Sequence, residues 1–274
     1  MANMNVTFWG VVGSCPGANR SIADYGIATP CVEVRLDDLL IILDCGTGVV
    51  PLGQKLHAER PLDMHMFISH THWDHILGMP FFSQAYLPEN KLTIYGLKRE
   101  DISLEKVFKG LMAYPYFPVP WETLQADINF KELEPKEVVE LDYGCKVVSF
   151  PTVHPGGNLA YAIHGDGKKV VYLTDLDHGA MDIGEIIDFI KYADILIYDA
   201  NFNQDEYEMD QYEGWGHSTW EFGLAMAKEA YVKHLVIFHH GVHRKKEELR
   251  ELETILYQET MHVSVAREGM TLRL

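Results

Sequence analysis

Three histidines and one aspartate lie within the short segment Ser69-His-Thr-His-Trp-Asp-His75. Imidazole nitrogens and carboxylate oxygens are the usual ligands of zinc and similar divalent ions. His70 and His72 are two positions apart and follow an apolar run, so on an extended segment their side chains project to the same side and can bind one ion. A turn into a helix at Asp74 and His75 can direct a second pair of ligands toward a neighbouring ion. The alternative interpretation is a group of solvated histidines in a polar turn.

The elements expected to position these side chains are mainly short strands. Apolar, β-branched runs bounded by Gly, Pro, Asp or Asn are typical of strands, and they occur at residues 6–9, 31–36, 39–43, 65–69, 92–95, 146–150, 159–163, 170–174, 194–198 and 234–238. Helical periodicity occurs at residues 49–59, 183–192, 219–232 and 245–258. This order predicts two sheets with helices packed outside, an α/β sandwich, and the family resemblance given below implies that both sheets are mixed.

Two local signals refine this picture. Ser218 followed by Glu221 fits a capping box at the start of the third predicted helix, and Gly165-Asp-Gly-Lys-Lys169 is typical of a hairpin turn. Residues 97–133 show no clear β pattern and contain a segment rich in proline and aromatic residues. We interpret them as a lid or insertion within a single domain that spans residues 1–274.

Composition limits the classes of partner and compartment. The formal net charge is −17, and because an acidic surface repels phosphate backbones, long nucleic acids are not expected as partners. No apolar run approaches the roughly 20 residues of a membrane span, and no signal peptide is evident, so a cytoplasmic location is expected. The four cysteines form no C-x-x-C pair and are predicted to be buried free thiols.

The pattern His70-x-His72-x-Asp74-His75 resembles the H-x-H-x-D-H motif of the metallo-β-lactamase fold superfamily, and the resemblance extends over nearly the whole chain. It implies an αββα sandwich with further metal ligands at the ends of later strands. By that resemblance, one metal ion is held by His70, His72 and His154, the other by Asp74, His75 and His239, and Asp175 bridges the two. A hydroxide between the ions would be the nucleophile. Zinc is the expected metal, and manganese or iron fits the same ligands.

The last ligand position has two candidates. His239 and His240 are adjacent, and successive residues of a strand point to opposite faces. Alignment with the strand-end histidine of the family favours His239, with His240 as the alternative.

Two further matches concern the reaction. Gly216-His-Ser-Thr219 resembles the G-H-S-T element of the tRNase Z-like branch, and Tyr198-Asp-Ala-Asn-Phe202 resembles its H-E-A-T-F element, with aspartate in place of glutamate. The resemblance implies that Asp199 orients His217, which protonates the leaving alkoxide of a phosphodiester. Asp74 is counted with this pair as a catalytic residue. The alternative is that His217 and Asp199 form only a structural hydrogen bond, and the shorter aspartate arm leaves the pairing geometry open.

The expected substrate is a small phosphodiester. Enzymes of the tRNase Z type carry a protruding arm between the equivalents of His154 and Asp175, whereas only residues 155–174 lie between them here. The chain also resembles cyclic-nucleotide phosphodiesterases of this fold, including the phage anti-Pycsar type, so 3′,5′-cyclic nucleotides are the leading substrates. Relatives in this branch imply a homodimer. Four aromatic side chains are candidates either to stack on a base, worth about 1–3 kcal/mol, or to form a plug or dimer contact: Tyr114, Tyr116, Phe117 and Trp121.

Other functions fit parts of the pattern. The main alternative is an RNA 3′-end endonuclease of the tRNase Z type. A non-catalytic, metal-binding scaffold protein would explain the ligands but not the pair formed by His217 and Asp199. A lactamase or thioesterase is a further alternative, but neither reaction would give the G-H-S-T element a role.

Overall fold

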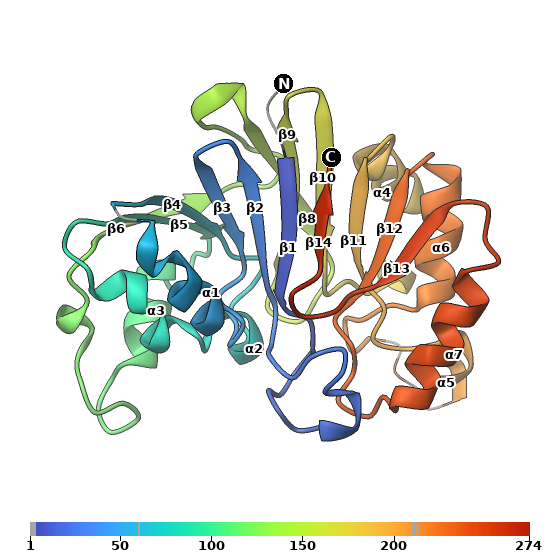
Figure 1. Ribbon diagram of the computed structural model, residues 1–274, viewed down its shortest axis with the longest axis horizontal. Helices are drawn as coiled ribbons and strands as arrows, with labels where there is room; N and C mark the ends of the chain where they lie inside the picture. The colour runs from blue at the N-terminus through green and yellow to red at the C-terminus, as the bar shows by residue number, and fades with distance from the viewer. Residues whose placement is uncertain (1–3, 60, 210–211, 213) are drawn as a thin grey trace.

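The computed structural model describes residues 4–59, 61–209, 212 and 214–274. Its strands form two seven-stranded sheets (Figure 1). The strand order in the first sheet is β14 (Thr271–Arg273), β1 (Met4–Gly10), β2 (Cys31–Leu36), β3 (Leu39–Leu43), β4 (Asp63–Phe67), β5 (Lys91–Leu97) and β6 (Asp127–Leu133). The order in the second is β13 (His262–Val265), β12 (His234–Phe238), β11 (Ile195–Asp199), β10 (Lys168–Leu173), β9 (Asn158–Gly165), β8 (Lys146–Thr152) and β7 (Val138–Glu140).

Each sheet combines a parallel and an antiparallel half. Strands β3 to β6 are parallel in the first sheet, and strands β10 to β13 are parallel in the second. The remaining neighbours pair in antiparallel fashion. Because the carboxyl ends of parallel strands meet at one edge of a sheet, the loops after β4, β10, β11 and β12 can bring their side chains together.

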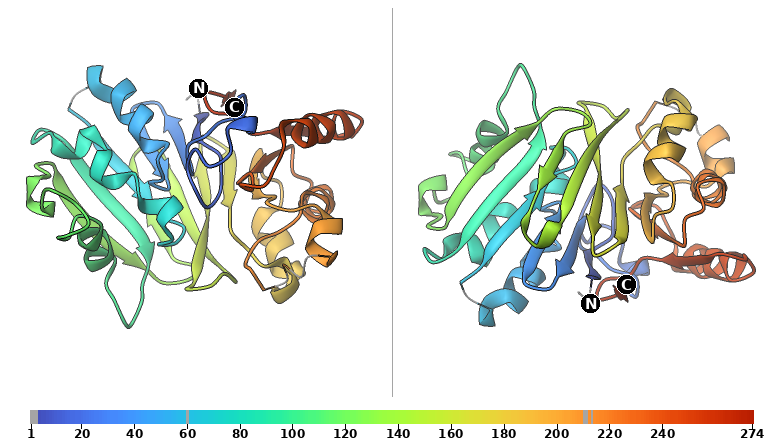
Figure 2. Two further views of the ribbon diagram at one scale, coloured as in Figure 1. Left: turned by 90° about the horizontal axis from the view of Figure 1, so that it is seen from below. Right: turned by 90° about the horizontal axis from the view of Figure 1, so that it is seen from above.

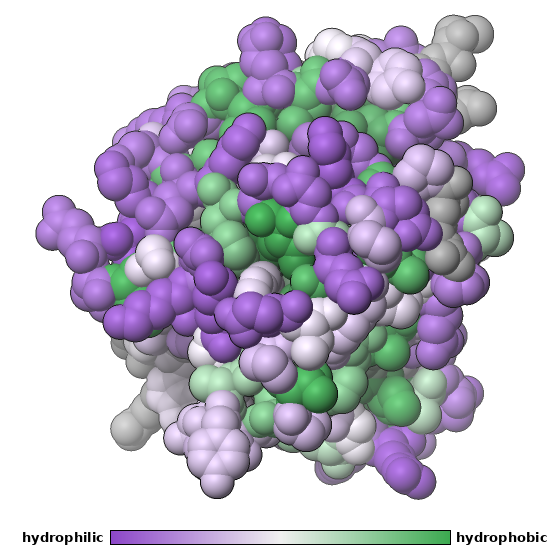
Figure 3. Space-filling model, turned by 90° about the vertical axis from the view of Figure 1, so that its left-hand side faces the viewer, coloured by the Kyte–Doolittle hydropathy of each residue, from purple (hydrophilic) through white to green (hydrophobic). Residues whose placement is uncertain are grey.

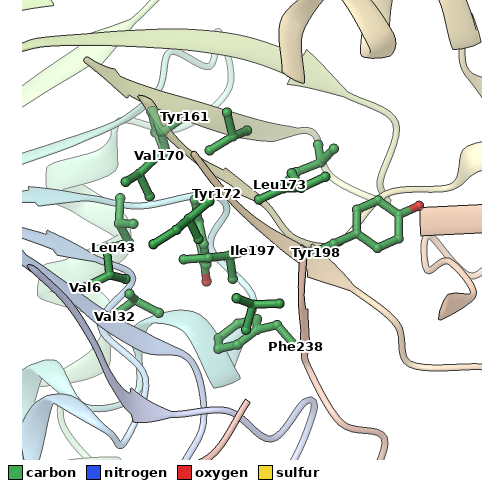
Figure 4. Close-up of a cluster of buried hydrophobic side chains, with 14 of the residues drawn as sticks. Val6, Val32, Leu43, Tyr161, Val170, Tyr172, Leu173, Ile197, Tyr198 and Phe238 are labelled. Carbon is green, nitrogen blue, oxygen red and sulfur yellow. The ribbon is translucent and has the colours of Figure 1, made fainter. Parts of the chain in front are cut away.

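The main hydrophobic core lies between the two sheets. Figure 4 shows side chains of the first sheet, such as Val32 and Leu43, facing Tyr172 and Ile197 of the second. Successive residues of a strand point to opposite faces, so Tyr198 lies on the outer face of the second sheet. Each large apolar side chain that is fully buried in this way contributes about 1.5–3 kcal/mol to folding.

The helices pack against the outer faces of the sheets, as Figures 1 and 2 show. Helices α1 (Val49–Lys55) and α3 (Leu104–Leu111) bury Leu52 and Phe108 in a second cluster against the first sheet. Helices α4 (Ile183–Ile190), α6 (Trp220–Glu229) and α7 (Lys246–Leu256) bury apolar side chains against the second sheet. Two short helices, α2 (Trp73–Ile76) and α5 (Gln204–Met209), lie in loops. The predicted α/β sandwich is therefore confirmed.

The ten predicted strands are all present, and four others were missed. One of these, β6, lies within residues 97–133, for which no β pattern was recognised. It is an edge strand in which exposed residues alternate with half-buried ones, so it lacks the apolar run that marks an inner strand. The predicted hairpin turn is confirmed, with Asp166 and Gly167 both at positive φ between β9 and β10.

Of two smaller predictions, one was wrong and the other was confirmed for three of its four residues. The residue that caps α6 is Thr219, whose side chain accepts a hydrogen bond from the Phe222 backbone. Ser218, the predicted cap, instead bonds to Tyr198. Of the four predicted buried thiols, Cys15 is exposed, while Cys31, Cys45 and Cys145 are buried.

The surface is largely hydrophilic on the face that Figure 3 shows, although apolar residues emerge between the hydrophilic ones. Among the described residues, no helix has the length and apolar character needed to cross a bilayer.

Candidate metal centre

The seven side chains proposed as metal ligands lie together beyond the carboxyl ends of strands from both sheets. His70 and His72 follow β4, and Asp74 and His75 belong to α2 directly after them. The other three follow strands of the second sheet, namely β8, β10 and β12, and are His154, Asp175 and His239. The site is thus built across the two facing sheets.

Among the described residues, four overlapping groups of potential ligand atoms have all their atoms within 4.8 Å of one another, and two of these groups match the ligand sets expected from the sequence. One group contains His70, His72 and His154, and Nε2 of His154 lies 3.0 Å from Nδ1 of His72. The other contains Asp74, His75 and His239. Nε2 of His75 and Nε2 of His239 both lie 3.3 Å from Oδ2 of Asp74.

Asp175 lies between the two groups. Its Oδ1 is 4.0 Å from Nε2 of His70 and 3.4 Å from Nε2 of His239, and its Oδ2 is 3.4 Å from Nε2 of His75. Oδ1 thus lies within 4.0 Å of histidines from both groups, and Oδ2 lies near His75 of the second group, so this carboxylate could be shared by two ions.

The residues present fit a pair of divalent ions. Nε2 of His70 and Nε2 of His75 are buried and have no hydrogen-bond partner among the described residues. A buried polar nitrogen without a partner is costly, and both of these face the other potential ligands. Imidazole and carboxylate donors suit zinc, manganese or iron.

The protonation of the cluster is consistent with this fit. Burial lowers the pKa of His70 well below its ordinary value, which favours the neutral form that binds metal. Burial opposes ionisation of Asp74, but the facing His75 and His239 hold its pKa well below its usual range. His70 is thus neutral and Asp74 ionised. Burial opposes a charge on His75, but the Asp74, Asp175 and Asp44 carboxylates raise the pKa of His75 well above its ordinary value, and bound cations would lower it.

A buried carboxylate that was missed in the sequence, Asp44, holds the first ligands in place. It follows β3, is fully buried, and its Oδ2 lies 2.7 Å from Nδ1 of His75. It also accepts hydrogen bonds from the backbone and hydroxyl of Ser69 and from the hydroxyl of Tyr172. Donation from Nδ1 of His75 leaves Nε2 free to bind metal. The only signal in the sequence was a polar residue directly after an apolar strand.

Other missed residues fix the loops. The side-chain amide of Asn158 donates to the carbonyls of Thr174 and Asp175. The backbone N–H of Ser14 donates to Oδ2 of Asp74 at 2.8 Å, which places the loop after β1 against the site. Gly13 in that loop is required, because a Cβ there would lie 2.4 Å from the ring of His239.

Three of these strand-end residues have left-handed backbone conformations. The φ angles are 61° at Asp44, 54° at Asp175 and 60° at His239. For residues other than glycine this conformation is costly and persists only when the surroundings hold it.

His217 and Asp199 lie beside the cluster. Nδ1 of His217 donates to Oδ2 of Asp199 at 2.9 Å and lies 3.6 Å from Oδ1 of Asp175. Burial opposes a charge on His217, but the Asp199 carboxylate and its hydrogen bond raise the pKa of His217 to about 9. Bound cations would lower this pKa. The shorter aspartate arm therefore still reaches the histidine.

His240 lies on the other side of the strand end. Its Nε2 donates to the Ala266 carbonyl at 2.8 Å, and burial lowers its pKa to about 4. Among the described residues, no candidate metal group includes it.

The aromatic segment lies beside the His72 side of the centre. Tyr116 and Phe117 line an apolar groove of about 730 Å³ together with Trp73 and Phe81. Tyr114 is 93% exposed, whereas Trp121 packs partly against the first-sheet cluster.

The distinction between His239 and His240 can be tested. Replacing His239 with Gln is expected to reduce the zinc content of a dialysed preparation from two ions per chain toward one, because one group loses a ligand. The matched His240→Gln variant is expected to keep both ions. Elemental analysis measures the content, and melting curves show that each variant is folded. Loss of zinc from the His240 variant alone would reverse the assignment.

The role of Asp44 can be tested separately. Asp44→Asn is expected to weaken zinc binding by about 10–100-fold, since the amide can no longer orient His75 as a carboxylate does. Calorimetric titration of zinc into metal-free protein measures this change, with the exposed Asp142→Asn variant as control. Unchanged affinity in a folded Asp44→Asn protein would contradict the role.

Comparison with known proteins places the chain in a family. Residues 40–240 match the family described as beta-lactamase superfamily domain. Ribonuclease Z of Archaeoglobus fulgidus is 26% identical over 292 residues, which cover 85% of this chain and 86% of that protein. Ribonuclease Z of Thermoplasma volcanium is 24% identical over 283 residues and 88% of each chain.

Solved structures agree on the fold. The metallo-β-lactamase fold protein YhfI from Bacillus subtilis superposes with a TM-score of 0.74 at 23% identity, covering all of both chains. A diphosphatase from the PhnP family gives 0.70 at 18% identity, covering 100% of this chain and 98% of that one. Human tRNase Z, short form, gives 0.69 at 21% identity and 98% of each. The chain therefore belongs to the β-lactamase superfamily domain family and is a hydrolase with the metallo-β-lactamase fold, and it is similar in sequence to ribonuclease Z enzymes.

Proposed function

We propose that this chain is a phosphodiesterase that works with two divalent ions, most simply zinc. The observation that carries the proposal is the His217–Asp199 pair, whose 2.9 Å hydrogen bond lies directly beside the ligand cluster. Acyl hydrolysis at a metal centre has no need of this pair, whereas a phosphodiester with an alkoxide leaving group needs a proton donor.

The ligands divide as the two groups of atoms suggest. One ion would be held by His70, His72 and His154. The other would be held by Asp74, His75 and His239, and Asp175 would contact both ions. The ions would supply positive charge next to the phosphate and would lower the pKa of a water molecule. Asp74 also accepts a hydrogen bond from the backbone N–H of Ser14. This carboxylate would therefore hold the loop after β1 in place in addition to binding a cation.

His217 would donate the proton to the leaving oxygen. Its Nδ1 is engaged by Asp199, so Nε2 is the nitrogen available to substrate. The side chain is 14% exposed, whereas Asp199 is fully buried. Asp199 thus orients the ring and favours its protonated form, and the ring remains within reach of a bound phosphodiester.

Two classes of substrate remain, each with its own support. The sequence relatives are named ribonuclease Z, which favours RNA 3′-end cleavage over cyclic nucleotides. Small phosphodiesters are supported by the tight hairpin that joins β9 and β10, which leaves no protruding arm between His154 and Asp175, and by the net charge of −17. A diphosphatase is among the proteins with this fold, and we take it as further support for a small substrate. Both classes require the same two ions and the same proton donor.

The dimer remains a prediction. The apolar groove lined by Trp73, Phe81, Tyr116 and Phe117 adjoins the centre through Thr71 and Trp73. It is suited either to a nucleobase or to a second copy of the chain, and exposed apolar surface of this kind is typical of a binding region.

The substrate class can be tested with purified, zinc-loaded protein. We expect hydrolysis of bis-p-nitrophenyl phosphate that a chelator abolishes and zinc restores. Parallel assays with cyclic AMP and with a precursor tRNA transcript then separate the two classes. Cleavage of the transcript without any hydrolysis of cyclic AMP would favour the RNA 3′-end endonuclease. No activity on any of these substrates, with zinc bound, would favour the non-catalytic scaffold.

The proton donor can be tested through the leaving group. His217→Ala is expected to lower kcat by about 10²–10⁴-fold for substrates with alkoxide leaving groups. It is expected to change kcat much less for p-nitrophenyl esters, because nitrophenolate leaves without a proton. Asp199→Asn should show the same pattern more weakly, and the exposed His57→Ala should show no change. Equal losses on both substrate classes would contradict proton donation by His217.

A further inference from the structure

Arg244 is a buried cation that does not belong to the ligand cluster. It lies in the turn between β12 and α7, five positions after His239 in the sequence. Only 8% of its side chain is exposed. A guanidinium is expensive to bury unless its N–H groups are bonded, so its partners indicate what it holds in place.

The guanidinium of Arg244 joins two elements. Its Nε and Nη2 both donate to the backbone carbonyl of Asn201, at 3.2 and 2.8 Å. Its Nη1 donates to Oε1 of Glu206 at 2.9 Å, and Nη2 donates to the other oxygen of the same carboxylate. The planar fork of arginine can reach a carbonyl and both oxygens of a carboxylate at once, whereas the single ammonium of lysine cannot.

Glu206 is itself fixed at the start of α5. Its Oε2 accepts the backbone N–H of Asn203 at 2.9 Å, and its own N–H donates to Oδ1 of Asn203 at 2.8 Å. The carboxylate that Arg244 binds is thus a rigid anchor. The loop between β11 and α5 is held at the Asn201 carbonyl from one side and at Glu206 from the other.

This loop sets the orientation of Asp199. The backbone N–H of Asn201 donates to Oδ1 of Asp199 at 3.1 Å, while Oδ2 of Asp199 accepts from His217. The side-chain amide of Asn201 also lies 3.4 Å from Nδ1 of His239. The backbone of a single residue, Asn201, therefore connects Arg244 to the carboxylate that orients the proposed proton donor.

We propose that Arg244 is a positioning residue that fixes Asn201 and thereby aligns Asp199 and His217 for proton transfer to the leaving group. The inference rests on the proposed phosphodiesterase function and adds to it a residue that contacts neither metal ligand nor substrate. It also gives a role to the buried positive charge of Arg244, which is not part of the ligand cluster.

The test compares Arg244→Lys and Arg244→Met with wild-type protein on two substrate classes. For esters with alkoxide leaving groups, we expect the lysine variant to lower kcat by about 10–100-fold, the usual range for residues that orient a metal site, with KM changed less than about threefold. For p-nitrophenyl esters we expect less than a threefold change. Arg250→Met is the control, because the Arg250 side chain is 61% exposed and lies 3.8 Å from the carboxylate of Asp24, far less engaged than Arg244.

A second readout needs neither metal nor turnover. In metal-free protein with ¹⁵N-labelled histidine, the Nδ1–H proton of His217 should give a downfield NMR signal protected by Asp199, which His217→Ala identifies by its loss. We expect the signal to be lost in Arg244→Lys and kept in Arg250→Met. If Arg244→Met fails to fold, the lysine variant, which keeps the buried positive charge, decides the question.

The outcomes are distinct. Wild-type activity and an intact NMR signal in Arg244→Lys would overturn the inference, and so would equal loss on both ester classes, since that indicates a structural role alone. If wild-type protein hydrolyses no phosphodiester, the proposed function fails, while the NMR comparison still tests the alignment of His217.

Discussion

The structure depends on bringing anionic carboxylates and unpartnered imidazole nitrogens into one buried space. Asp175 is the centre of this arrangement, because its two oxygens face histidines from both groups of ligands. Such a cluster is costly in a protein interior unless cations balance it. The two sheets face each other so that strand ends from both halves of the chain meet at this point. The sandwich therefore positions the side chains, and the balance of charge at its edge determines whether they can bind cations.

Much of this arrangement could be predicted from sequence because the signals are local. The segment from His70 to His75 concentrates four proposed ligands in one turn, and inner strands such as β10 and β11 are continuous apolar runs. Edge strands such as β6 and β7 were missed, since an edge strand is exposed on one side and lacks that run. The cap at Thr219 was displaced by one residue because Ser218 has a tertiary partner, which no local pattern reveals.

The residues that support the site were harder to find than the ligands. Asp44, Asn158 and Arg244 act through hydrogen bonds to residues far away in sequence, so neither spacing nor composition indicates them. The difference between His239 and His240 also depended on tertiary context, namely the Ala266 carbonyl that binds one of them. The choice between RNA and a small phosphodiester depends on surface shape, which the strand pattern describes only through the short connection between β9 and β10.

The left-handed backbone at Asp44, Asp175 and His239 links the local stability of this edge to cation binding. Each such residue costs of order 1–3 kcal/mol and is held only by what surrounds it. Without ions, the buried Nε2 atoms of His70 and His75, which have no hydrogen-bond partner among the described residues, add to this cost at the same edge. Local opening should therefore begin at the catalytic edge, while the opposite edge, closed by the hairpin at Asp166 and Gly167, keeps its protection against hydrogen exchange. The cations would then stabilise the fold at this edge as well as take part in the reaction. The availability of metal would determine whether the loops at the catalytic edge are ordered.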